Sequence, residues 1–74
     1  MDLSVVALGK TCTIKEINTG DKELDAFLFS LGCYVGEPIT VVFRRKSGCT
    51  VAIKNARYSI DSHLAKAIVV EVVE

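Results

Sequence analysis

Apolar residues recur at helical spacing in one segment of the chain, residues 21–31. The positions that follow the i, i+3, i+4, i+7 pattern of a single helical face are Leu24, Phe27, Leu28 and Leu31. Asp21 precedes them and can cap the helix by accepting hydrogen bonds from the free N–H groups of its first turn. Gly32 follows directly and suits the left-handed conformation that ends many helices. The pattern predicts one helix with an apolar face packed on the rest of the molecule.

Elsewhere the chain shows the shorter patterns that are typical of β-strands. Residues 11–17 are rich in β-branched side chains and predict a first strand. Residues 39–44 and 49–54 alternate between apolar and polar on either side of a Lys-Ser-Gly turn, which indicates a β-hairpin. Residues 58–60 and 68–73 predict two further strands, and Asp61 can cap a single helical turn over residues 63–66.

These elements predict a mainly β fold, a small SH3-like barrel of five to six short strands. One α-helix is inserted after the first strand, and a short helical turn precedes the last. A barrel is favoured over an open sheet because it closes its own edges. A ferredoxin-like α+β fold is the alternative, but it needs a second full helix. No repeat or linker divides residues 1–74, so we expect one domain. The expected core comprises Leu24, Phe27, Leu28, Leu31, Ile39, Val41, Phe43, Val51 and Ile53.

Composition narrows the possible partners and location of this domain. Lys and Arg total 9 and Asp and Glu total 9, so no net charge attracts a nucleic acid. The longest uncharged run, residues 26–36, is well short of the roughly 20 apolar residues that span a bilayer. The chain begins without the basic and apolar segments of a signal peptide. We therefore expect a cytoplasmic protein that neither binds nucleic acid nor inserts into a membrane.

The residue types that carry chemistry are few and widely spaced. Cys12, Cys33 and Cys49 fit neither a disulfide framework nor a CxxC metal site, so we expect three buried thiols. His63 is the only histidine and the one candidate metal ligand, yet a ferrous site normally needs two or three converging ligands. No nucleophile and base, paired carboxylates or phosphate loop have a suitable spacing. The sequence predicts no enzymatic activity, no cofactor and no metal site within one chain.

Two surface features are not needed by the predicted fold. Phe29 lies far from the apolar helix face on a helical wheel, with Tyr34 shortly after it in the chain. Arg44, Arg45 and Lys46 form a basic cluster at the hairpin tip. An exposed aromatic residue can anchor a partner protein, and rim charges speed the encounter. We hypothesise that the two features form one partner surface.

The order of these elements resembles the FeoA family of ferrous-iron-transport proteins. The resemblance rests on the spacing Leu28-x-x-Leu31-Gly32-x-x-x-Gly36 after a strand and a loop, and it covers essentially the whole chain. Asp61 stands where the family often has a basic residue, so a surface near Asp61 is expected to differ here. The resemblance implies an SH3-like barrel without enzymatic activity. It also implies a cytoplasmic accessory role in ferrous iron uptake, as a protein-binding module on the FeoB permease, whose cytoplasmic part carries a GTPase domain.

Other functions stay open at this point. The chain could carry ferrous iron directly with ligands from two subunits of a homo-oligomer, or act as a metal-responsive regulatory SH3-like module. Related modules form the last domain of certain metal-responsive repressors, where they follow a helix-turn-helix domain that this chain lacks. A reader of proline-rich peptides is disfavoured, because that groove is lined by aromatic residues and the chain has no Trp and only 2 Tyr.

Overall fold

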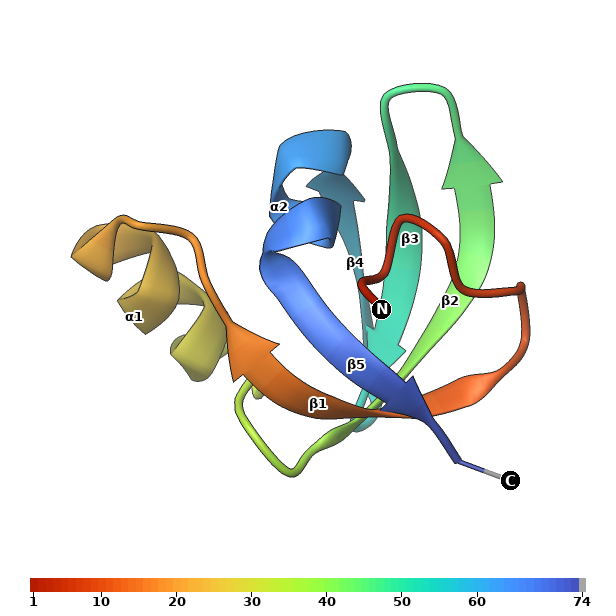
Figure 1. Cartoon of the computed structure of the whole chain (residues 1–74), viewed down its shortest axis with the longest axis horizontal. Coiled ribbons are helices and arrows are strands. Elements are labelled where there is room, and N and C mark those ends of the chain that lie inside the picture. Colours follow the sequence, from red (N-terminus) through yellow and green to blue (C-terminus); the bar gives the residue numbers. More distant parts are fainter. Residues whose placement is uncertain (74) are drawn as a thin grey trace.

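One antiparallel sheet makes up most of the computed structural model, which describes residues 1–73 (Figure 1). Its strands are β1 (Thr11–Ile17), β2 (Pro38–Arg45), β3 (Gly48–Ile53), β4 (Ala56–Asp61) and β5 (Ile68–Val72). Helix α1 (Lys22–Ser30) follows β1, and α2 (Ser62–Ala67) precedes β5. The mainly β class, the helix after the first strand and the hairpin of β2 and β3 are confirmed.

The sheet has the strand order β4-β3-β2-β1-β5, with antiparallel neighbours throughout. It is strongly bent, and its concave side holds the core (Figure 1). β4 and β5 are the two edges and do not pair with each other in the part of the chain that the structure describes. The sheet is therefore not a closed barrel, and the SH3-like detail stays a prediction.

Five of the nine expected core residues are buried, and two are not. The buried ones are Leu28, Ile39, Val41, Val51 and Ile53. Leu24 and Leu31 are half-buried. Phe27 is 53% exposed and Phe43 is 57% exposed, so the prediction was wrong at both positions.

A β-bulge explains the exposure of Phe43. Val41 pairs with Val51, but the next pair is Phe43 with Thr50, so one extra residue lies in β2. Side chains alternate strictly along a regular strand, and an inserted residue reverses which side the following ones face. Beyond the bulge Phe43 points outward and Arg44 points inward, the reverse of the expected alternation.

α1 lies beside the sheet rather than across it, which explains the exposure of Phe27. Figure 1 shows the helix projecting to one side of the strands, next to the end of β1. Leu28 is its only buried residue among those that the structure describes. A helix held along such a narrow stripe leaves the flanks of its apolar face in water. Gly32 ends the helix at a φ of 92° as predicted, and the N–H of Cys33 donates to the carbonyl of Leu28.

The N-terminal segment packs against the sheet without forming a strand of its own. Leu3 and Val6 are buried, and the N–H of Leu3 donates to the carbonyl of Ile68 in β5. The Arg44 guanidinium donates to the carbonyls of Leu3, Ser4 and Val6 at 3.1, 3.1 and 2.7 Å. Arg44, on the inner face of β2, thus holds the N-terminal segment against that strand.

Candidate protein-binding surface

Phe29 and Tyr34 form an aromatic pair on the outside of the molecule. Phe29, on the outer side of α1, is 62% exposed, as its place on the helical wheel predicts. The chain turns back after Gly32, and a second turn brings the N–H of Glu37 to the carbonyl of Tyr34. The two ring centroids come to 4.9 Å with the planes tilted by 42°. Offset and tilted ring pairs of this kind are favourable, and this one fixes the orientation of an otherwise exposed phenylalanine.

Lys54 completes this cluster from the turn between β3 and β4. Its ammonium lies 5.5 Å from the centroid of the Tyr34 ring and 2.5 Å from Oε1 of Glu37. The hydrogen bond that Lys54 donates to Glu37 is the largest of the effects that raise the pKa of Lys54. A Cβ added to Gly32 would lie 2.9 Å from Cε of Lys54, so the glycine leaves room for this side chain. We call Phe29, Tyr34 and Lys54 the aromatic patch.

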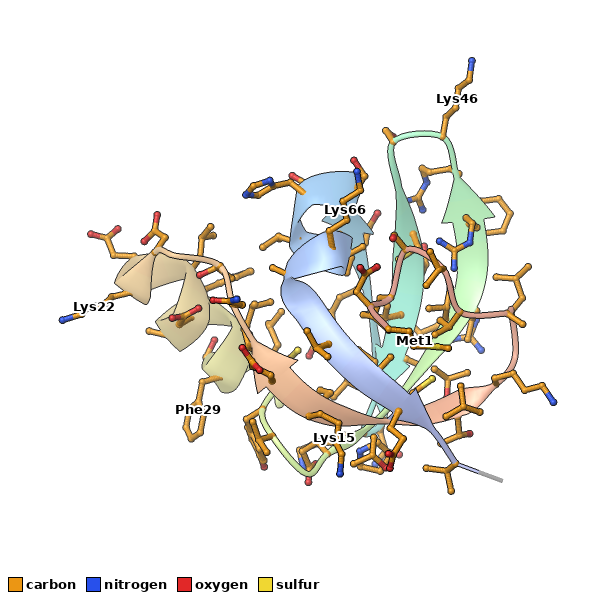
Figure 2. All side chains as sticks on the ribbon, in the orientation of Figure 1. Met1, Lys15, Lys22, Phe29, Lys46 and Lys66 are labelled. Carbon is orange, nitrogen blue, oxygen red and sulfur yellow. The ribbon has the colours of Figure 1, made fainter. Side chains whose placement is uncertain are left out.

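The three cations at the hairpin tip do not form one surface. Arg44 is half-buried and occupied by the N-terminal carbonyls, which differs from the exposed charge we expected. Arg45 lies on the outer face of the sheet, and its guanidinium donates to Ser59 Oγ at 2.9 Å and Thr50 Oγ1 at 2.7 Å. Lys46 alone extends from the tip into solvent (Figure 2).

The aromatic patch and the hairpin tip are separate. Figure 2 shows Phe29 and Lys46 at opposite ends of the molecule. The structure therefore joins Phe29 to Tyr34 and separates both from Lys46. Sequence reasoning missed the contact of Lys54 with Tyr34. The contact depends on the space that Gly32 leaves beside Lys54, and the sequence alone does not show which side chain lies next to that glycine.

His63 is exposed in the first turn of α2. Its nearest acidic neighbour along the chain, Asp61, uses Oδ1 to accept from the N–H of Leu64 and so caps the helix. Within residues 1–73 no three His, Cys, Asp or Glu side chains come together as a metal site would require. His63 would need ligands from elsewhere to bind a ferrous ion.

The three thiols are free and buried, as expected from their spacing. Burial raises the pKa of each, and it raises that of Cys33 to about 11. A thiol that stays protonated is a poor nucleophile and a poor metal ligand. The cysteines therefore contribute to the core rather than to a reactive site.

A protein-family model described as the FeoA domain matches residues 1–72. The chain belongs to the FeoA family. No match is found among curated proteins. No helix within residues 1–73 of this FeoA-family chain is long and apolar enough to cross a membrane.

Solved structures agree with this assignment. The chain resembles iron(II) transport protein A from Clostridium thermocellum, with a TM-score of 0.89 and 29% identity over 99% of this chain and 46% of that one. It thus spans about half the length of that protein. The chain also resembles a crystal structure of an iron uptake regulatory protein (FeoA), with a TM-score of 0.88 and 23% identity over 99% of this chain and 97% of that one. At this identity the likeness concerns the fold only. A manganese-dependent transcriptional repressor matches 97% of this chain over 40% of its own length, with a TM-score of 0.85 and 27% identity.

Proposed function

We propose that this chain is an accessory protein of ferrous iron uptake that acts by binding the cytoplasmic part of an FeoB-type permease. Membership of the FeoA family supports the pathway, and the likeness to iron(II) transport protein A is consistent with it. The aromatic patch supports a binding role. It is the single structural observation on which the proposal rests.

The aromatic patch has the features of an energetic anchor at a protein interface. Phe29 gives a large apolar surface, and its contact with Tyr34 restricts how far the ring can move when free. A side chain that is already ordered loses less conformational entropy on binding. Lys54 lies over the Tyr34 ring and is paired with Glu37, so it adds order to the patch rather than a free charge.

The chemistry of the remaining residues fits binding better than catalysis. The thiols are buried with raised pKa values, and His63 stands apart from other ligands in the described chain. The partner would supply the reaction, because its cytoplasmic part carries the GTPase domain that the family resemblance implies. On this proposal the chain is not an enzyme and works in the cytoplasm.

One other function has a specific observation in its favour. The likeness to a manganese-dependent transcriptional repressor is compatible with a metal-responsive regulatory module. That function predicts that manganese or ferrous ions bind the isolated chain. Direct carriage of iron between subunits predicts the same for a homo-oligomer, with His63 as a ligand.

The test measures binding of the full chain to the purified cytoplasmic domain of the permease, with and without guanine nucleotide. Phe29→Ala should weaken binding by about 1–3 kcal/mol, mainly through faster dissociation, because a buried aromatic anchor is lost. The melting temperature should stay nearly unchanged, since Phe29 is exposed. Both quantities can be followed by surface plasmon resonance and differential scanning calorimetry.

Phe27→Ala is the matched control, because Phe27 is a similarly exposed aromatic residue of the same helix, two positions away. It should bind the permease domain as the parent does. Equal loss in both variants would mean that the helix as a whole, rather than the aromatic patch, is needed. Micromolar ferrous binding that His63→Ala abolishes would replace the proposal with the carrier function.

A further inference from the structure

The outward face of β2, β3 and β4 carries a second group of side chains that the core does not use. Phe43, Arg45, Thr50 and Ser59 lie together on this face, which we call the Arg45 face. The strand register aligns them, since Phe43 pairs with Thr50, and Thr50 with Ser59. The β-bulge in β2 turns Phe43 to this side, and bulges often redirect a side chain toward a functional surface.

Arg45 is held rigidly across this face. Its two terminal nitrogens donate to hydroxyls on two different strands, Thr50 in β3 at 2.7 Å and Ser59 in β4 at 2.9 Å. The guanidinium carbon lies 5.6 Å from the centroid of the Phe43 ring. A guanidinium has five N–H donors, so these two hydrogen bonds leave three for another acceptor. The side chain is thus oriented in advance and still able to bind.

The positive charge of this face has no carboxylate partner in the described chain. The ion pairs within residues 1–73 join Lys15 to Glu71 and Lys54 to Glu37, and neither includes an arginine. Arg57 lies two residues before Ser59 in β4 and faces the same way. The one acidic residue on this side of β4 is Asp61, whose Oδ1 accepts the N–H of Leu64. Both hydroxyl partners of Arg45 are neutral, so its charge remains available.

An open hollow of about 380 Å³ adjoins the Arg45 face. It is lined by Thr11, Glu37, Pro38, Thr40, Ala52 and Lys54. Small side chains form the bottom of the hollow, where Thr40 pairs with Ala52 across the two strands. Ala52 in turn pairs with Arg57, which places an arginine beside the hollow. The surface therefore offers room for a chain lying along the sheet, with Arg57 beside it and the ion pair of Lys54 and Glu37 in its wall.

We propose that the Arg45 face and the adjoining hollow bind an extended segment of a partner protein in which a carboxylate side chain and an apolar one stand two residues apart, on the same side of that segment. Arg45 would hold the carboxylate through a planar pair of donors, which is the geometry that suits a guanidinium. Phe43, 57% exposed, would receive the apolar side chain. A nucleic acid fits less well, because the chain carries 9 acidic and 9 basic residues and has no broad positive field.

This inference does not depend on the proposed function. The aromatic patch includes Phe29 on α1, whereas the Arg45 face belongs to the strands and approaches the hairpin tip (Figure 1). Lys54 belongs to the aromatic patch and also lines the hollow, so the two surfaces adjoin at that residue. Phe29 and Arg45 each belong to one surface only, so variants at these two positions test the surfaces separately.

The experiment follows amide chemical shifts of the 15N-labelled full chain during titration with a short synthetic peptide in which glutamate and phenylalanine stand two residues apart, with serine between them. Shifts are expected at Thr50, Ala52 and Ser59. Arg45→Gln should weaken binding at least about tenfold, since a hydrogen bond to a charged group is lost. Arg45→Lys should restore only part of the affinity, because the charge returns without the planar fork. Lys22→Gln, an exposed change on α1, should bind as the parent does.

Several results would overturn the proposal. A peptide with glutamine in place of glutamate should not bind, and equal binding of that peptide would show that the carboxylate is not recognised. Shifts confined to α1 would move the site elsewhere. Inorganic phosphate or phosphatidylglycerol vesicles that bind more tightly than the peptide, with the same dependence on Arg45, would identify a phosphate-binding surface instead. Shifts that depend on protein concentration without peptide would identify a second copy of the chain as the occupant.

Discussion

α1 and α2 both begin after an aspartate that caps them, yet they relate to the sheet in opposite ways. α1 has 9 residues and buries one side chain, Leu28. α2 has 6 residues and buries Ala65 and Ala67. The shorter helix lies over the strands as part of the core, whereas the longer one stands to the side (Figure 1).

The packing around the two helices also differs, since it is tight near α2 and open near α1. Near α2 the backbone segments approach closely, since Gly48 is buried and the N–H of Ser62 donates to the carbonyl of Ser47 at 2.8 Å. Around α1 large apolar side chains face solvent, namely Phe27, Phe29 and Val35. Regions with few buried contacts open more easily than the global fold, and binding surfaces are often drawn from them. The α2 end is thus held to the sheet by closely packed backbone, whereas α1 is held by one buried side chain and can open more easily.

Gly48→Ala tests the α2 end and should have the largest effect. A Cβ at this position would overlap the carbonyl oxygen of Ile60 and lie 2.7 Å from the Cα of Asp61. These are backbone atoms, so relief requires β3 and β4 to separate where Asp61 caps α2. We expect a loss of about 3 kcal/mol or more in the free energy of unfolding, measured by urea denaturation. The neighbouring exposed change Ser47→Ala should stay within about 0.5 kcal/mol. A stable Gly48→Ala protein would show that the close approach is not needed.

Leu28→Ala tests the α1 end and should have a smaller effect. Leu28 is 1% exposed and is the one buried contact that α1 makes. We expect a loss of about 2–3 kcal/mol, the lower part of the range for such truncations, because a peripheral helix can relax into the space. Phe27→Ala, at an exposed position beside it, should change stability by less than about 0.5 kcal/mol. If Leu28→Ala cost more than Gly48→Ala, α1 would be as central to the fold as α2.

The position of each element could be predicted from the sequence, but how deeply each is buried could not. The i, i+3, i+4, i+7 pattern identified α1 and its end at Gly32, because these depend on local backbone preferences. The same pattern wrongly predicted that Phe27 is buried, since a wheel shows which face is apolar and not how much of it meets the sheet. Phe43 was misplaced for a related reason: one extra residue reverses the alternation, and a bulge has no reliable local signature.

The candidate surface was predictable only in part. Exposure of Phe29 followed from helical periodicity alone. Its contact with Tyr34 depends on two turns at Gly32 and Gly36, both with positive φ, and the sequence marks these glycines without fixing where the chain goes between them. Arg44 was misread because its partners are backbone carbonyls about 40 residues earlier in the chain. Such carbonyls carry no residue identity, so no side-chain pattern could point to them.

The aspartates that cap α1 and α2 also distinguish the two helices, although replacing them should change stability less than Gly48→Ala or Leu28→Ala. Asp61 accepts from the N–H of Leu64 at 2.8 Å, and Asp21 accepts from the N–H groups of Glu23 and Leu24 at 2.9 and 3.3 Å. Removing a cap typically costs about 1 kcal/mol of helix stability. Asp61→Ala should lower the global free energy of unfolding by that amount, because α2 cannot unwind without exposing buried alanines.

Asp21→Ala should lower the global free energy of unfolding by less than Asp61→Ala does, although it removes more hydrogen bonds. α1 can unwind while the sheet stays folded, so part of the cost appears as local opening. Native-state hydrogen exchange should then show faster exchange of the α1 amides, with the amides of β3 unchanged. Asp21→Asn and Asp61→Asn keep an acceptor oxygen and should behave nearly as the parent does. Equal loss of global stability in Asp21→Ala and Asp61→Ala would mean that both helices unfold with the sheet as one unit. The aromatic patch would then lie on a rigid support rather than on a helix that can open by itself.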